Sequence, residues 1–140
     1  MIVVPFEPGH LKLLRPQASQ VSIDHAVSDE QAQYLASCLS FTGLVDGKPM
    51  ACSGVVPFWG SRGVAWAILD ADSGPHFTAI HKAVYSFLEV SDFKRVEAYV
   101  DLDFKPAHRW MRMLGFAVEL PIARGILPSG KDGAIYSRFK

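Results

Sequence analysis

The sequence predicts a single α/β domain, with a mixed, mostly antiparallel sheet of six or seven strands and helices on both faces. Segments with the alternating period of a strand and segments with the period of a helix follow one another along all 140 residues. Short turns that contain glycine separate several strands, which favours antiparallel pairing. One longer helical segment lies between two strands and predicts a parallel pair there.

The composition is that of a folded protein without a charge bias. Apolar residues make up 49% of the chain, and 14 Lys and Arg balance 14 Asp and Glu. This balance disfavours nucleic acid as a partner, and no apolar run reaches the roughly 18 residues of a membrane helix. Cys38 and Cys52 lack the spacing of a metal site and are expected to be reduced thiols. Because the chain starts without a basic leader, we expect no signal peptide and a cytoplasmic protein. Because its sequence has no metal-ligand cluster, we expect no bound metal.

Periodicity and turn residues place the expected elements. Strands are expected at 2–6, 41–45, 50–58, 64–69, 95–101, 117–122 and 134–139, and helices at 8–15, after Ser28, at 75–89 and between Asp103 and Gly115. Asp46-Gly47 predicts a hairpin between the second and third strands. Ser28 and Gln31 have the spacing of a capping box. Gly54, inside a strand, indicates a bulge or the close approach of another backbone segment.

The stretch 95–116 changes its period in the middle. One side of a strand holds Val96, Ala98, Val100 and Leu102, and the other holds Glu97, Tyr99, Asp101 and Asp103. The helical stripe that follows consists of Phe104, Ala107, Trp110, Met111 and Leu114. Asp103 is expected to cap this helix. Gly115 is expected to end it in the left-handed conformation, so that Phe116 folds back onto Met111.

The segment 109–116, R-W-M-R-M-L-G-F, resembles the second half of the GCN5-related N-acetyltransferase (GNAT) fold. In that family, a helix that ends in L-G-F packs beside the acyl-coenzyme A (acyl-CoA). The expected order of elements, β-α-α-β-β-β-α-β-α-β-β, is similar to that fold over most of the chain. The segment is most similar to the short GNAT-like proteins of tailed phages, including the T7-type internal virion protein group.

The resemblance implies that acetyl-CoA binds between the strands 64–69 and 95–101. The residues that would hold it are Ile68, Leu69, Asp70, Ser73, Gly74, His76, Phe77 and Arg109. The family binds the pyrophosphate at a helix N-terminus, where free N–H groups and the helix dipole attract an anion. Here the matching turn has one glycine, Pro75 removes a donor, and Asp70 and Asp72 add negative charge. An ordinary turn and helix cap is therefore the alternative.

Three features that often support catalysis in this family are changed in this chain. Met111 stands where a tyrosine acid is often found, and Phe104 stands where the helix often starts with asparagine. The strand 64–69 has no glutamate that could act as a base. These departures lower the expected efficiency, although orientation of a bound donor and acceptor can still promote acetyl transfer.

His108 and Asp101 are the candidate catalytic residues that the chain offers instead. A histidine on the polar side of the last helix suits a general base, or is simply a solvated surface residue. Asp101 and Asp103 form a paired carboxylate site, or only cap and solvate the turn. Arg109 holds a phosphate or coats the helix.

We therefore expect an acyl-CoA-dependent N-acetyltransferase that acts on an amine of a small molecule or a protein, encoded by a phage and located in the host cytoplasm. The alternative is a GNAT-fold protein without catalysis that binds a protein partner, in virion assembly or to inhibit a host protein. In the family, the loop matching 124–133 borders the acceptor site. Ile126 and Leu127 in this loop would contact the acceptor or the partner. The oligomeric state is left open by the sequence.

Overall fold

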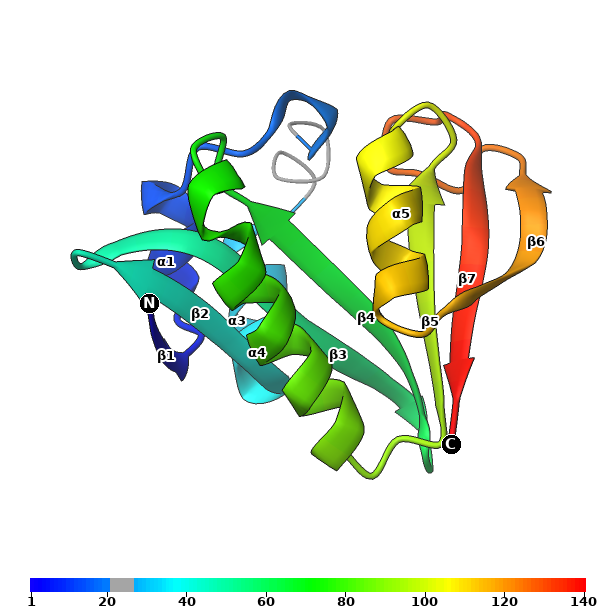
Figure 1. Cartoon of the computed structure of the whole chain (residues 1–140), viewed down its shortest axis with the longest axis horizontal. Helices are drawn as coiled ribbons and strands as arrows, with labels where there is room; N and C mark the ends of the chain where they lie inside the picture. The colour runs from blue at the N-terminus through cyan, green and yellow to red at the C-terminus, as the bar shows by residue number, and fades with distance from the viewer. Residues whose placement is uncertain (21–26) are drawn as a thin grey trace.

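The computed structural model describes residues 1–20 and 27–140, in which a seven-stranded sheet carries helices on both faces (Figure 1). The strands are β1 (Ile2–Pro5), β2 (Leu39–Val45), β3 (Lys48–Trp59), β4 (Arg62–Leu69), β5 (Arg95–Asp101), β6 (Ala117–Ala123) and β7 (Gly133–Phe139). The helices are α1 (Pro8–Leu13), α3 (Asp29–Ser37), α4 (Phe77–Val90) and α5 (Lys105–Met113), with short 3-10 turns η1 (Ala18–Gln20) and η2 (Gly74–His76). The strand order is β1-β2-β3-β4-β5-β7-β6, and the expected fold class is confirmed.

Three local predictions are confirmed, each for the physical reason expected. Asp46 and Gly47 both have positive φ, 50° and 77°, which gives the turn between β2 and β3 the twist a tight hairpin needs. Ser28 and Gln31 form a reciprocal capping box at the start of α3. A Cβ atom on Gly54 would lie 2.5 Å from a backbone oxygen of β2, so glycine allows the two strands to approach closely.

Two hydrophobic clusters hold the helices against opposite faces of the sheet. The cluster under α4 and α5 includes Leu69, Ile80, Leu88, Val96, Val100, Trp110, Leu114, Phe116 and Tyr136. The cluster under α1 and α3 contains Phe6, Leu11, Leu14, Ala32, Cys52 and Ile68. Because successive strand residues point to opposite faces, Leu69 and Ile68 at the end of β4 belong to different clusters.

The end of α5 follows the expectation, but its start does not. Gly115 has a φ of 87°, and the Phe116 N–H donates to the Met111 carbonyl over 2.9 Å. The prediction that Asp103 caps the helix is wrong, because Phe104 is the N-cap residue and makes no side-chain cap bond. Instead the Asp103 N–H donates to the Asp101 carboxylate, which folds these residues into a turn before the helix begins.

The centre of the sheet opens between β4 and β5. These strands are parallel neighbours joined through α4, as expected, but they pair only over Arg62–Val64 and Arg95–Glu97. Beyond these residues the strands diverge, so the sheet has a V-shaped gap that opens toward the ends of β4 and β5 (Figure 1). This gap positions the candidate site.

The outer strand β6 lies at the edge of the sheet beside β7. Its pairing with β7 shifts register twice, between Val118 and Leu120 and between Leu120 and Ala123. Pro121 lies within the second shift and has no N–H to donate. The apolar side chains of Val118, Leu120 and Ile122 are exposed by 44 to 58%.

Trp110 should be a main contributor to stability. Its side chain is 8% exposed and packs edge-on against Phe77 of α4, with ring centroids 5.4 Å apart. Trp110→Ala is expected to lower the free energy of unfolding by roughly 3–5 kcal/mol, the cost of deleting a large buried aromatic side chain. The measurement is urea denaturation. The control Trp59→Ala, at a side chain that is 68% exposed, should cost less than about 1 kcal/mol. Equal losses in the two variants would contradict the burial of Trp110.

Candidate functional site

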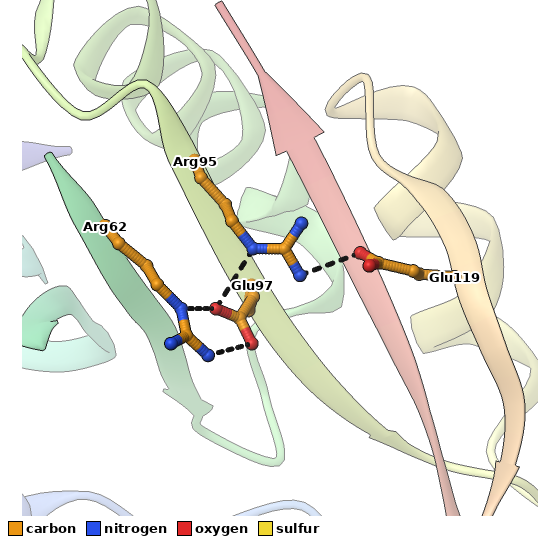
Figure 2. A network of polar contacts seen from close by, with 4 residues as sticks. All are labelled: Arg62, Arg95, Glu97 and Glu119. Atoms are coloured by element: carbon orange, nitrogen blue, oxygen red, sulfur yellow. Dashed lines mark hydrogen bonds and ion pairs between the residues drawn. The ribbon is translucent and has the colours of Figure 1, made fainter.

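A buried carboxylate marks the point where β4 and β5 begin to separate. Glu97 of β5 is 4% exposed and accepts hydrogen bonds from Arg62 of β4, through Nε and, over 3.1 Å, through Nη2. Arg95 donates to the same carboxylate over 3.3 Å and to Glu119 of β6 over 2.8 Å. Figure 2 shows how the four side chains connect β4, β5 and β6 on one face of the sheet.

These contacts keep Glu97 ionised. Hydrogen bonds from Arg62, and then from Arg95, outweigh the cost of burial and lower the pKa of Glu97 below its ordinary value. A carboxylate with such a low pKa and two guanidinium partners is a poor proton acceptor. Glu97 therefore fixes the geometry of the strands and is not a candidate base.

Beyond this network, a cleft of about 600 Å³ lies in the gap between the two strands. Its walls come from both sides of the sheet: Val84 and Met111 from α4 and α5, and Tyr34 and Leu35 from α3. Most of the lining is apolar, and none of its described residues is Lys, Arg or His. The groups in these walls that can exchange a proton are Tyr34, Tyr99 and Asp101. The cleft suits a ligand that is largely neutral and apolar.

Aromatic side chains join α4 and α5 on the helix side of the cleft. The indole N–H of Trp110 donates to His81 Nδ1 over 3.2 Å. Phe77 stacks on His81 and contacts Trp110 edge-on. These contacts span the space between the two helices that flank the gap, and so limit the helix-side opening.

Tyr99 and Asp101 lie two residues apart on one face of β5, and both line the cleft. The Asp101 carboxylate accepts from the Asp103 N–H over 2.9 Å and from Lys131 over 3.2 Å. Partial burial, helped by the nearby Glu97 carboxylate, raises the pKa of the Tyr99 phenol. The wall of the cleft therefore holds two groups side by side: the Asp101 carboxylate, which is a proton acceptor, and the Tyr99 phenol, which is a proton donor.

His108 lies behind this wall. Its Nε2 lies 2.9 Å from the Asp101 backbone carbonyl, and its Nδ1 lies 2.7 Å from the Tyr136 hydroxyl. Since a carbonyl only accepts, Nε2 donates to it, and Nδ1 shares a hydrogen bond with the Tyr136 hydroxyl. His108 does not line the cleft, but it bonds to the main-chain carbonyl of Asp101, which does. The predicted catalytic pair is thus adjacent, but only Asp101 faces the cleft.

The cofactor residues predicted on β4 have different surroundings. Ile68 lines the cleft. The Leu69 N–H donates to the Gln20 side-chain oxygen over 2.9 Å, and the Leu69 carbonyl accepts from the Gln17 N–H over 3.1 Å. The Gln20 side-chain NH₂ also donates to the Ala67 carbonyl over 2.7 Å. Gln17 and Gln20 of the N-terminal segment thus supply hydrogen-bond partners for the backbone groups at the end of β4.

Asp70 is buried directly after β4. Its carboxylate accepts from the backbone N–H groups of Asp72 over 2.9 Å and of Arg15 over 2.8 Å. Burial opposes ionisation of Asp70, but these two hydrogen bonds and the Arg15 charge prevail, and its pKa is lowered. The Asp70 side chain is therefore fully engaged in holding the N-terminal segment to the sheet.

The predicted pyrophosphate turn, residues 73–77, has few free backbone donors. The Ser73 N–H donates to Asp70, the His76 N–H to Ser73 and the Phe77 N–H to Gly74. Pro75 has no N–H, which leaves Gly74 as the one free backbone donor that the structure gives this turn. A Cβ atom on Gly74 would meet nothing within 4 Å, so a ligand can approach its backbone.

Arg109 lies away from the cleft, on the exposed side of α5. It lines a second hollow of about 400 Å³, together with Leu102, Lys105, His108 and Arg112. In the part of the chain that the structure describes, Lys105, Arg109 and Arg112 form no ion pair. The structure thus does not bring Arg109 together with Ile68 or the turn 73–77.

The described residues, 1–20 and 27–140, form neither a metal site nor a membrane-spanning helix. No three His, Cys, Asp or Glu side chains among them lie close enough to hold a metal ion. None of the helices they form is both long enough and apolar enough to cross a membrane.

Solved structures with the same arrangement are numerous, although sequence comparisons give no relative. No model of a known protein family matches the chain, and no curated protein matches it. Ard1 from Thermoplasma volcanium superposes with a TM-score of 0.80 at 13% identity, over 99% of this chain and 96% of that protein. A GNAT-family acetyltransferase from Streptococcus pneumoniae superposes with a TM-score of 0.70 at 14% identity, over 99% of both chains. The chain has the GNAT fold.

A third structure with the GNAT fold agrees over nearly the same length. The ribosomal-protein-S18-alanine N-acetyltransferase from Escherichia coli gives a TM-score of 0.72 at 18% identity, over 99% of this chain and 92% of that one. The fold predicted from the segment 109–116 is therefore confirmed. At these identities the likeness concerns the fold, and function has to be argued from the residues of the cleft.

Protonation of Glu97 should destabilise the protein in acid. A carboxyl group whose pKa is lower in the folded state contributes stability above its unfolded value, here 4.5, and that stability is lost as the pH falls through the folded value. We expect Glu97→Gln to be less stable than the wild type at pH 7 and to lose less stability between pH 7 and pH 3. Urea denaturation across that range measures both. Parallel stability curves for the two proteins would contradict the lowered pKa.

Proposed function

We propose that this protein is an acyl-CoA-dependent N-acetyltransferase that acts on an amine of a small molecule or a protein. The observation that carries the proposal is the apolar cleft that passes through the sheet where β4 and β5 separate, in a chain with the GNAT fold. A cleft open to both faces allows a donor and an acceptor to meet from opposite sides of the sheet. The expected acetyl-CoA and amine acceptor suit this arrangement.

The residues present fit the acyl and pantetheine end of acetyl-CoA better than its pyrophosphate. The apolar walls and the gap-facing edge of β4 suit an acyl group and an extended pantetheine arm, with Ile68 and Leu69 beside it. The turn offers the pyrophosphate the N–H of Gly74 and the side chain of His76, while Ser73 and Phe77 shape the turn. The acyl and pantetheine end would therefore supply most of the affinity.

Two side chains in the wall of the cleft would make the two proton transfers that acetyl transfer requires. Acetyl-CoA, when bound, supplies an acetyl group activated as a thioester. Asp101 would accept the proton that the amine nitrogen loses as its bond to the acetyl carbon forms. Tyr99 would donate its phenolic proton to the sulfur as the carbon–sulfur bond breaks, because its raised pKa keeps it protonated at neutral pH. His108 would act as a positioning residue, through its bond to the Asp101 carbonyl.

The acceptor would enter from the side of the sheet that faces α3. Tyr34 and Leu35 of α3 line this part of the cleft, and so do Ile126 and Leu127 of the loop after β6. This position supports the expectation that the loop 124–133 contacts the acceptor. Few charged groups occur here, so an acceptor with an apolar body suits the walls.

A second function is favoured by the turn after β4. Its backbone donors are largely used within the chain, and Met111 replaces the usual tyrosine acid of the family. A GNAT-fold protein of a phage, which binds a protein partner in the host cytoplasm without acetyl transfer, would need neither feature. The phage origin rests on the segment 109–116 alone.

Binding of acetyl-CoA separates the two functions. If the protein is a transferase, acetyl-CoA at a hundredfold excess over its dissociation constant should stabilise the folded state by about 2.7 kcal/mol. The resulting rise in melting temperature can be measured by differential scanning fluorimetry, with adenosine 3′,5′-bisphosphate as the control for the nucleotide end. An unchanged melting temperature at millimolar acetyl-CoA would contradict the transferase proposal and favour the binding role.

Removal of the proposed acid should slow turnover more than binding. Tyr99→Phe keeps the ring and removes the proton donor, so kcat is expected to fall by about 10²-fold or more, with little change in the KM for acetyl-CoA. The matched control is Tyr85→Phe, because Tyr85 lies on α4 and does not line the cleft. Release of free thiol from acetyl-CoA follows the reaction. Equal kcat values for the two variants would rule out Tyr99 as the acid.

A further inference from the structure

The segment 15–20 lies alongside the end of β4 and the turn after it, in the position of a further strand. The Arg15 N–H donates to the Asp70 carboxylate over 2.8 Å, and the Ala71 N–H donates to the Arg15 carbonyl over 2.7 Å. Pro16 and Asp70 form an isolated antiparallel bridge. Further along, Gln17 and Gln20 bond to Leu69. The segment thus covers part of the edge that β5 leaves when it diverges.

The pairing of β3 with β4 shows which backbone groups face the gap. The Asp70 N–H donates to the Met50 carbonyl over 2.8 Å, so these two opposite residues form a hydrogen-bonded pair. Hydrogen-bonded pairs alternate along antiparallel strands, so Ile68 and Trp66 also bond to β3. The backbone groups of Ala67 and Leu69 therefore point away from β3, into the gap.

The side chain of Gln20 occupies these groups in the manner of a neighbouring parallel strand. In parallel pairing, one residue donates its N–H to the carbonyl of a residue on the facing strand and accepts from the N–H two positions further on. Gln20 donates to the Ala67 carbonyl over 2.7 Å and accepts from the Leu69 N–H over 2.9 Å. One primary amide thus reproduces both bonds of a strand residue, at the wall of the cleft that Gln20 also lines.

We propose that Gln20 is an internal competitor of ligands at the gap-facing edge of β4, where its side-chain amide occupies the Ala67 carbonyl and the Leu69 N–H. The ligand class is an extended chain with a secondary amide, which the pantetheine arm of an acyl donor provides, so this inference rests on the proposed function. Such a ligand must displace Gln20 before it can bond to Ala67 and Leu69. Gln20 therefore lowers the affinity for the donor and selects ligands whose amide replaces both of its bonds.

Removal of the Gln20 amide tests the proposal. Because the occupant makes two hydrogen bonds, each with a small net free energy, Gln20→Ala should bind acetyl-CoA about tenfold more tightly than the wild type. Gln17→Ala is the matched control, because Gln17 bonds to Leu69 through its main-chain N–H, which the substitution keeps. Isothermal titration calorimetry measures all three proteins. Equal affinities of Gln20→Ala and the wild type would overturn the role of Gln20 while leaving the transferase proposal intact. Failure of both to bind acetyl-CoA would overturn both proposals.

A spectroscopic measurement on the wild type follows the displacement directly. In a ¹H–¹⁵N spectrum, acetyl-CoA should shift the backbone amide of Leu69 and move the Gln20 side-chain NH₂ signals to the position of a solvated amide. An unchanged Gln20 NH₂ signal at saturating acetyl-CoA would overturn the proposal. If Gln20→Ala does not fold, Gln20→Glu keeps the length of the side chain and removes its donor. This variant should also bind acetyl-CoA more tightly.

Discussion

The buried carboxylate of Glu97 is the interaction on which the centre of the structure depends. A carboxylate at this depth is stable only because guanidinium groups from two strands surround it, and together they fix the starts of β4 and β5 side by side. No comparable contact joins the described parts of the two strands further along, so their parallel pairing stops after Val64 and Glu97. The gap and the cleft lie between two strands that pair at one end only.

Separation of two strands leaves polar backbone groups that must find other partners. On the β4 side, Gln17 and Gln20 supply them, and on the β5 side His108 bonds to the Asp101 carbonyl. The two sides differ, because the β4 groups of Ala67 and Leu69 bond to the side-chain amide of Gln20, whereas the His108 ring on the β5 side also bonds to Tyr136. The same unpaired edge that would destabilise an isolated strand thus gives the cleft its means of recognising polar groups.

Local patterns predicted the elements well, and the failures arise from contacts between distant residues. The alternation in β5 correctly places Tyr99 and Asp101 on one face, but nothing in it shows that β4 turns away there, so it does not reveal that Tyr99 lines a cleft. Gln20 lies in a polar stretch without periodicity, and its partners are 47 and 49 residues away. Asp103 is not the cap because it lies in a turn with Asp101, and the helix starts one residue later, with Phe104 as its N-cap residue. The fold could be predicted because helix and strand periods are local, whereas a cleft is made of side chains that only the fold brings together.

The irregular outer strand has a consequence for the behaviour of the protein at high concentration. A sheet that ends in a regular strand offers its free N–H and C=O groups to other chains, and apolar side chains such as Leu120 and Ile122 would favour that contact. Two register shifts and Pro121 break the row of donors in β6, so a second sheet cannot align along it. The strand therefore guards against edge-to-edge aggregation by its shape rather than by its charge.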